Sequence, residues 1–321
     1  MKNTNFHLLF AAVLFLLITC GNVYSQDNPA YDFLNVSPSA RASALANAFE
    51  SYTGDPNIIF YNPAGLSTVA SKELSAGFGK YLLDINFGSA AFTYKYKNAG
   101  WFGLGVKYFN YGKFTYTDEN GNEYGTFHAN DLMFDVGYSN LIYGKINYGI
   151  NAKFIYSQIA EYTSTALGFD LGLMYIIPAS DMNIAFTINN YGKQLSSYIS
   201  SKERLPLDIR IGVSKKLEHL PLRLSVSLSN LNQDHIKFLD VKRLKYFSFG
   251  GEFEISDHVA ARIGYDNQER QDLTTGTSLG IVGFSAGIGI KFLEKYKFDY
   301  SLNSMGKTGS THRFNVGYIF D

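Results

Sequence analysis

Two short motifs in the chain have residue types that could do chemistry. Gly283-Phe284-Ser285-Ala286-Gly287 matches the G-x-S-x-G pattern of serine nucleophiles. That pattern needs a turn from a strand into a helix, whereas Ser285 lies within a long alternating segment with no helix after it. No histidine or acid is arranged around it, so we predict that Ser285 is a strand residue.

The second motif runs from Asp118 to Glu123 and resembles a calcium-binding loop. It lacks the glycine at the sixth position and the glutamate at the twelfth, so a polar hairpin tip is the better interpretation. The six histidines are scattered without metal-ligand spacing, and no phosphate-binding loop is present. We therefore expect no enzyme activity, no catalytic residue, no metal and no cofactor.

Composition indicates a strand-rich protein. The 321 residues include 24 Tyr, 26 Phe and 30 Gly but only 7 Pro, a mixture typical of barrels with aromatic girdles. The formal net charge is zero and Lys and Arg are spread along the chain, which argues against nucleic-acid binding.

The first 25 residues have the features of an export signal. Lys2 is followed by the apolar run Leu8–Ile18, which is too short to span a bilayer, and Ser25 is suited to cleavage before Gln26. The alternative is a lipoprotein signal ending at Cys20, the only cysteine, although Thr19 fits that pattern poorly. We expect residues 1–25 to be a signal peptide, 26–72 a plug segment and 73–321 an outer-membrane barrel.

The barrel prediction depends on alternation. In the last segment Phe314, Val316, Tyr318 and Phe320 alternate with polar or small residues, as in a strand with one lipid face and one wet face. Fourteen segments have this character, and most reach the nine or more residues that a tilted strand needs to cross a bilayer. They are Glu73–Tyr81, Asn86–Lys97, Trp101–Gly112, Asn130–Leu141, Lys145–Gln158, Thr165–Ile176, Asn183–Tyr191, Leu207–Leu217, Leu222–Asn230, Lys245–Ile255, His258–Asp266, Thr277–Phe292, Tyr296–Asn303 and His312–Phe320.

The polar face of these segments carries both signs of charge. We expect charges such as Lys107, Lys153 and Asp170 to pair inside a narrow barrel, with the glycines leaving room for something within it. In the twelfth segment the alternation changes parity, which predicts a bulge near Ile281–Val282. A soluble sandwich would explain the alternation but not the long strands or the aromatic load.

The segment before the first strand is a candidate plug. Pro38 to Phe49 is rich in small residues and predicts a helix capped by Ser37. Asn62 and Pro63 begin a turn with a second short helix. With Arg41, these are the residues that we assign to the plug in the barrel mouth.

Three longer polar connections are candidate surface loops: Gly112–Ala129, Asn190–Pro206 and Asn230–Leu244. In the first, Asn120-Gly121 predicts a hairpin that projects as a small ribbon. Tyr116, Tyr124 and Phe127 are candidate partner contacts there, because aromatic side chains supply contact area at low entropic cost. They are equally suited to an aromatic girdle at the lipid boundary.

The plug phrase Asn62-Pro63-Ala64-Gly65-Leu66 before fourteen strands resembles the FadL-like outer-membrane barrels. The phrase from Asp32 to Ala42 is similar to the PorV/PorQ family of the type IX secretion system. The stretches Lys80–Asn86, Leu205–Leu222 and Ser304–Gly306 with Thr311–Phe314 resemble its PorQ branch.

This resemblance implies a non-enzymatic outer-membrane component of the Bacteroidetes secretion and surface-attachment machinery. Its implied partners are outer-membrane lipid and PorU-, PorV- and PorZ-like attachment proteins, with contact to lipid or lipopolysaccharide. The alternative is a FadL-type channel for hydrophobic small molecules, and an outer-membrane enzyme is a third hypothesis that lacks a catalytic constellation. The channel and the secretion component share a fold, so fold cannot separate them.

Overall fold

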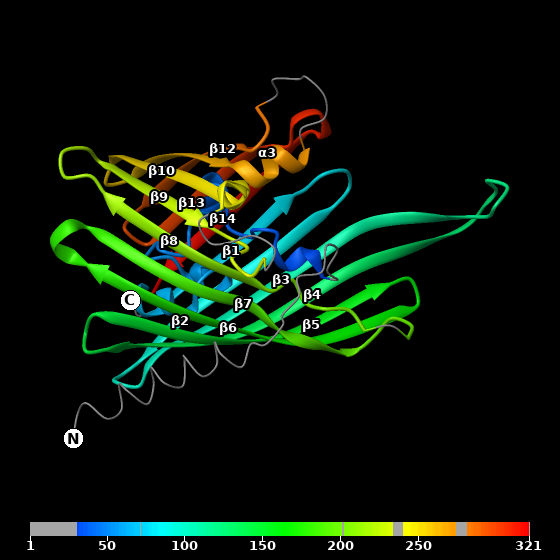
Figure 1. The fold of residues 1–321 in the computed structure, drawn as a ribbon, viewed down its shortest axis with the longest axis horizontal. Helices are drawn as coiled ribbons and strands as arrows, with labels where there is room; N and C mark the ends of the chain where they lie inside the picture. The colour runs from blue at the N-terminus through cyan, green and yellow to red at the C-terminus, as the bar shows by residue number, and fades with distance from the viewer. Residues whose placement is uncertain (1–30, 71, 201, 234–239, 274–280, 321) are drawn as a thin grey trace.

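The chain forms a closed antiparallel barrel (Figure 1). The computed structural model describes residues 31–70, 72–200, 202–233, 240–273 and 281–320, so the predicted signal peptide and Asp321 lie outside the described residues. Fourteen strands pair in chain order, which confirms the predicted fold class. They are β1 (Lys72–Lys80), β2 (Asn86–Tyr96), β3 (Gly100–Thr117), β4 (Glu123–Ile142), β5 (Ile146–Ile159), β6 (Tyr162–Ile177), β7 (Met182–Ser196), β8 (Asp208–Lys216), β9 (Leu222–Leu228), β10 (Phe247–Ser256), β11 (Val259–Asp266), β12 (Phe284–Phe292), β13 (Tyr296–Ser304) and β14 (Ser310–Ile319).

The seam of the barrel lies between β1 and β14. The two strands pair in unbroken register from Glu73 opposite Ile319 to Lys80 opposite His312. Arg313 points inward and is 4% exposed, whereas Phe314 points outward and is 52% exposed. The last predicted strand therefore closes the barrel with the two faces that its alternation indicates.

The outer face of the wall is apolar around the barrel. Leu104, Val136, Ile150 and Phe298, from four different strands, are each more than two-fifths exposed. A monomeric soluble protein rarely exposes so much contiguous apolar surface, and such a belt is what a barrel presents to lipid. Among the described residues, no helix is both long and apolar enough to cross a membrane.

The two ends of the barrel differ in the length of their connections. At one end, here the turn end, two to five residues join each pair of strands, as in 143–145 and 257–258. At the other, the loop end, the connections 197–207, 229–246 and 267–283 are much longer. They carry η5 (Val241–Tyr246) and α3 (Asn267–Leu273), while η4 (Pro178–Ser180) and η6 (Gly306–Thr308) are single turns elsewhere.

The first predicted surface loop is largely strand. β3 and β4 continue as a two-stranded ribbon that reaches well beyond the other strands (Figure 1). At its tip Asp118 Oδ1 accepts hydrogen bonds from the backbone N–H groups of Asn120 and Asn122, at 2.9 and 2.8 Å. The predicted ribbon and hairpin tip are confirmed, and the first part of the second predicted loop also belongs to a strand, β7.

The predicted bulge in the twelfth strand is wrong. β12 begins at Phe284 and keeps one parity to Phe292, with Ser285 inward. The change of parity falls in the turn before the strand, where Gly283 has a φ of +79°. Ser285 donates a hydrogen bond to the carbonyl of Ala44 at 3.1 Å, so the residue of the G-x-S-x-G motif is a structural contact.

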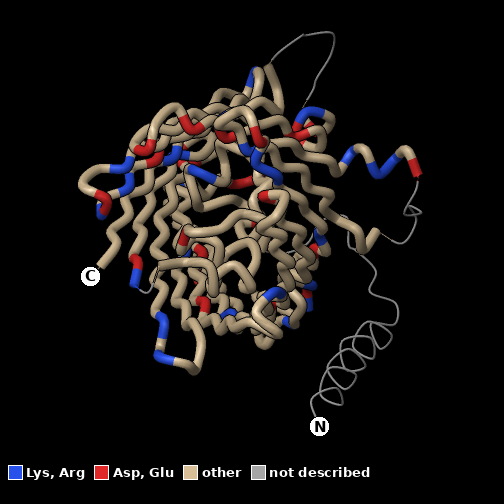
Figure 2. The backbone as a smooth tube through the Cα atoms, turned by 90° about the vertical axis from the view of Figure 1, so that its left-hand side faces the viewer, with Lys and Arg blue, Asp and Glu red and all other residues tan. Residues whose placement is uncertain are grey.

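The N-terminal segment, residues 31–70, folds inside the barrel, and we call it the plug (Figure 2). It contains η1 (Asp32–Leu34), α2 (Ala40–Ala44), η2 (Pro56–Phe60) and η3 (Pro63–Thr68). Near the loop end Tyr31 contacts Ser164, and near the turn end Val69 accepts a hydrogen bond from Trp101 Nε1. The plug therefore runs through the lumen from the loop end to the turn end.

The predicted plug helix is shorter than expected, and its cap is different. α2 has five residues, and the side chain of Ser39, not Ser37, accepts from the backbone N–H of Ala42. The Ser37 hydroxyl contacts Tyr61 instead. Ala46 and Asn47 take φ values of 51° and 61°, which end the helix and turn the chain over the inner wall.

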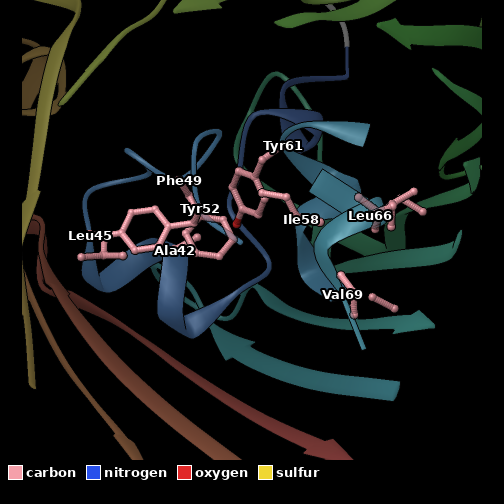
Figure 3. Packing of buried hydrophobic residues seen from close by; sticks show 10 residues of the cluster. Ala42, Leu45, Phe49, Tyr52, Ile58, Tyr61, Leu66 and Val69 are labelled. Atoms are coloured by element: carbon pink, nitrogen blue, oxygen red, sulfur yellow. The ribbon is translucent and has the colours of Figure 1, made fainter. Parts of the chain in front are cut away.

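The main apolar core is made almost wholly by the plug. Phe49 stacks on Tyr52 with ring centroids 5.1 Å apart, and Figure 3 shows these rings beside Leu45 and Tyr61 within the plug. Ala91 is the only fully buried member that the wall contributes among the described residues of this cluster. Burial of these side chains holds the plug together, while its edges contact the wall.

Inward-facing glycines let the plug approach the wall closely. A Cβ on Gly149 of β5 would lie 2.3 Å from the carbonyl carbon of Pro63, so Gly149→Ala must displace plug backbone. We expect it to lower the free energy of unfolding by about 1–3 kcal/mol, measured by denaturant unfolding in detergent. Gly88→Ala in β2 is the control, because its Cβ would meet only Gly77 O at 3.8 Å. Equal effects of the two variants would contradict the close fit.

Candidate functional site

One buried ionic cluster ties the plug to the wall. Arg41 of α2 binds both carboxylate oxygens of Glu252 on β10, through Nε at 2.8 Å and Nη2 at 2.7 Å. Arg262 of β11 binds the same carboxylate at 2.6 Å and also reaches Asp299 of β13 at 2.5 Å. The predicted plug residue Arg41 is thus anchored to a network that spans four strands of wall.

The other inward cations serve the plug backbone or a neighbouring acid. Lys107, which is 2% exposed, donates to the carbonyls of Phe33, Leu34 and Val36 at 2.7–3.1 Å. Arg313 donates to the carbonyl of Ser37 at 2.9 Å. The expected pairing of inward charges is correct for Lys153, which binds Asp170 at 2.7 Å, but Lys107 and Arg313 bind carbonyls because the irregular plug exposes them.

Asn62 and Pro63 lie at the start of η3, as predicted. The side chain of Asn62 accepts from the N–H of Ala64 at 3.0 Å and donates to the carbonyl of Glu50 at 2.7 Å. Pro63 follows as the first residue of the turn, where its missing N–H has no partner to lose. Together they fix the turn that packs against β4, β5 and β6.

A cavity of about 760 Å³ lies at the loop end, over the plug turn at Ala46–Asn47. Its lining comes from the plug, from β7 through the β7–β8 connection into β8, from the β9–β10 connection with the start of β10, and from the end of β11 with α3. Representative lining residues are Asn35, Asn47, Asp208, Arg210, Lys245 and Gln268. The volume is in the range of small-molecule sites, but the lining is mainly polar.

Two ion pairs lie in the cavity wall. Arg210 binds Asp208 within β8, and Lys245 of η5 binds Asp272 of α3 at 2.7 Å. On α3, burial and the adjacent Asp266 carboxylate raise the pKa of Glu269 to about 7. No three His, Cys, Asp or Glu side chains in the described ranges gather as a metal site.

A smaller cavity of about 30 Å³ continues inward from the first. Asn35, Asn47, Asn190, Asp208 and Arg210 line both, and the inner one also meets Lys107 and Lys153. The inner space has room for about one water molecule. The polar surface is therefore continuous from the loop end to the ionic groups beside the plug.

The three predicted contact residues gather on the β3–β4 ribbon, far from the cavity. Tyr116 stacks on Tyr124 with ring centroids 5.6 Å apart and meets Phe127 at 4.8 Å. Phe114 stacks on Phe127 at 5.1 Å and extends the row. The structure thus brings these residues together as one ladder of rings and separates them from Arg41, Asn62 and Pro63.

Comparison with known proteins identifies the fold. No protein-family model matches the sequence, and no curated protein matches it. Among solved structures, the Ralstonia pickettii toluene transporter TbuX is similar at 12% identity and a TM-score of 0.56, over 88% of this chain and 96% of that one. A Pseudomonas aeruginosa FadL homologue is 10% identical at a TM-score of 0.55, over 89% and 99% of the two chains.

The monoaromatic hydrocarbon channel CymD is also similar, at 12% identity and a TM-score of 0.55, over 90% of this chain and 97% of that one. At these identities the likeness concerns the fold. The chain therefore has a FadL-like fold, a closed 14-stranded barrel of the kind found in outer-membrane channels.

Sequence reasoning missed the cavity residues of the plug and of α3. Asn47 and Gln268 line the same cavity although they lie near opposite ends of the chain. Polar residues in a small-residue helix and in a long connection carry no spacing signal, so nothing in the sequence links them. Asp208 and Arg210 were identifiable as inward charges from their strand alone.

The Arg41–Glu252 pair gives a testable difference between buried and exposed ion pairs. Arg41→Gln removes a two-pronged contact in a largely buried cluster, and we expect a loss of about 3 kcal/mol in unfolding free energy. Lys291→Gln is the control, because it breaks the exposed Lys291–Glu294 pair at a turn, and solvent screening should leave the unfolding free energy almost unchanged. Denaturant unfolding measures both, and similar losses would rule out a special role for the plug cluster.

Proposed function

We propose that the protein is a non-enzymatic, FadL-type outer-membrane channel that admits a small molecule through the loop-end cavity. The observation that carries this is the cavity of about 760 Å³ above the plug, at the end where the long connections gather. The apolar outer belt and the fold shared with transporters and channels support placement in the outer membrane.

The polar cavity lining bears on which small molecule passes. TbuX and CymD are described as a toluene transporter and a monoaromatic hydrocarbon channel. In this chain the approach to the plug is bordered by the charged residues Asp208, Arg210 and Lys245 and by amides. An apolar solute would have to displace water from paired charges there, so the lining supports a solute with polar groups.

A filled cavity tests this proposal. Ser248 is buried at the cavity wall, and Ser248→Trp would occupy much of the space. We expect several-fold slower uptake of glucose into proteoliposomes. Ser256→Trp, at the exposed turn end of the same strand, should leave uptake unchanged. If Ser248→Trp folds and transports glucose at the original rate, the cavity is not on a transport path.

A second function is favoured by the aromatic ladder. We infer as an alternative that the barrel holds partner proteins of the type IX secretion and attachment machinery, through Tyr116, Tyr124 and Phe127. The ribbon that carries them projects beyond the wall, and stacked rings of this kind make efficient protein contacts (Figure 1). PorU-, PorV- and PorZ-like proteins, and lipid or lipopolysaccharide, are the proposed partners.

The two functions separate in cells that lack the gene. Restoring it with Tyr116, Tyr124 and Phe127 all changed to Ser should leave surface anchoring of cargo bearing a C-terminal signal defective. The matched triple Tyr94→Ser, Tyr96→Ser and Tyr143→Ser lies at the turn end and should restore anchoring. Normal anchoring in the deletion strain itself, with impaired solute uptake, would exclude the attachment function and favour the channel.

A further inference from the structure

The loop-end cavity has an unusual number of amide side chains. Seven Asn or Gln residues line it, among them Asn35 and Asn47 from the plug and Gln268 from α3. An amide group both donates and accepts hydrogen bonds without carrying charge. A wall of this kind matches a ligand whose surface alternates donors and acceptors.

The charges in the cavity do not favour an ion of either sign. Four carboxylates and three cationic side chains line it, so the two signs nearly balance. Arg210 is held by Asp208, and Lys245 is held by Asp272. An anion binding at Arg210 or Lys245, or a cation binding at Asp208 or Asp272, would have to break one of these pairs, whereas a neutral polar ligand would not.

An unsatisfied acceptor lies at the cavity floor. Among the described residues, Asn47 Oδ1 is buried without a hydrogen-bond partner. Asn47 lines both the large cavity and the small inner one, so its side chain lies where the two cavities meet. If the amide turns toward the large cavity, a hydroxyl group of a ligand supplies the missing donor.

We infer that the loop-end cavity binds a neutral saccharide, with Asn47, Asn35 and Gln268 as hydrogen-bonding residues. A volume of about 760 Å³ is sufficient for a mono- or disaccharide with bridging waters. This inference deepens the proposed channel function by naming its ligand class, and it rests on that function only in treating the cavity as a ligand site.

Binding is measured directly on the full-length mature barrel in a detergent without a sugar headgroup. Glucose, maltose and N-acetylglucosamine are the probes, with toluene as the apolar comparison, and titration calorimetry gives the dissociation constants. Gln268→Met keeps the length and helix propensity of the side chain but removes the amide. We expect at least one sugar to bind, and Gln268→Met to weaken its binding by about tenfold.

The control is Gln271→Met on the same helix, at an exposed position outside the cavity. This variant should bind the sugar with the affinity of the original protein. Gln268→Met also removes a 3.2 Å contact from Asn230, so a second variant is needed in case α3 unfolds. Asn35→Leu changes an exposed plug residue and should weaken the same sugar, again by several-fold.

Three results would overturn the inference. They are binding of none of the three sugars by folded protein, unchanged sugar affinity in both cavity variants, or toluene binding that Gln268→Met strengthens. Failure of the channel function is a separate result: sugar binding without proteoliposome uptake would refute transport and leave the site intact. Uptake without sugar binding would refute the site and leave the channel intact.

Discussion

The buried carbonyl groups of the plug impose the strongest constraint on this molecule. The plug has only short helical turns, and its internal hydrogen bonds leave several carbonyls, such as those of Leu34, Val36 and Ile59, to other donors. A carbonyl buried without a donor is costly. The wall supplies the donors: Lys107 alone serves three carbonyls, and Arg313 and Asn151 serve one each. The inner face of the barrel is therefore polar because of what it encloses, and not only because it is a lumen.

Close packing between the wall and the plug adds to the hydrogen bonds that hold the plug in place. The inward glycines at 149 and 172 bring wall backbone against Pro63 and Asn62, and the rings of the plug form an apolar core of their own. The Arg41–Glu252–Arg262 cluster then fixes the plug in position at the opposite wall. A plug held by so many contacts to separate strands moves as a unit or by local unfolding of one part, rather than by small sliding.

The uneven height of the wall explains where the cavity lies. β3 to β6 run 14 to 20 residues, whereas β8 to β10 run only 7 to 10. At the loop end, long connections and α3 follow the short strands and form the wall of the cavity. These connections carry polar backbone groups and amide side chains. The FadL-like fold is thus combined with a polar approach to the plug. The lining of the loop-end cavity, rather than the fold, indicates which class of ligand the protein takes.

The sequence by itself determined the fourteen strands, the facing of residues such as Arg313 and Phe314, the ribbon at Asn120-Gly121 and the turn that begins at Asn62. These follow from a period of two and from local turn preferences. It did not determine the end of α2 at Ala44, because the turn that follows, at Ala46, packs closely against the wall at Gly264. It also could not join Asn47 to Gln268 or Arg41 to Glu252, since each pair meets only when the barrel closes around the plug. Contacts between residues so far apart in the sequence depend on the register of the paired strands and on the enclosure of the plug by the barrel. Only the tertiary structure supplies both.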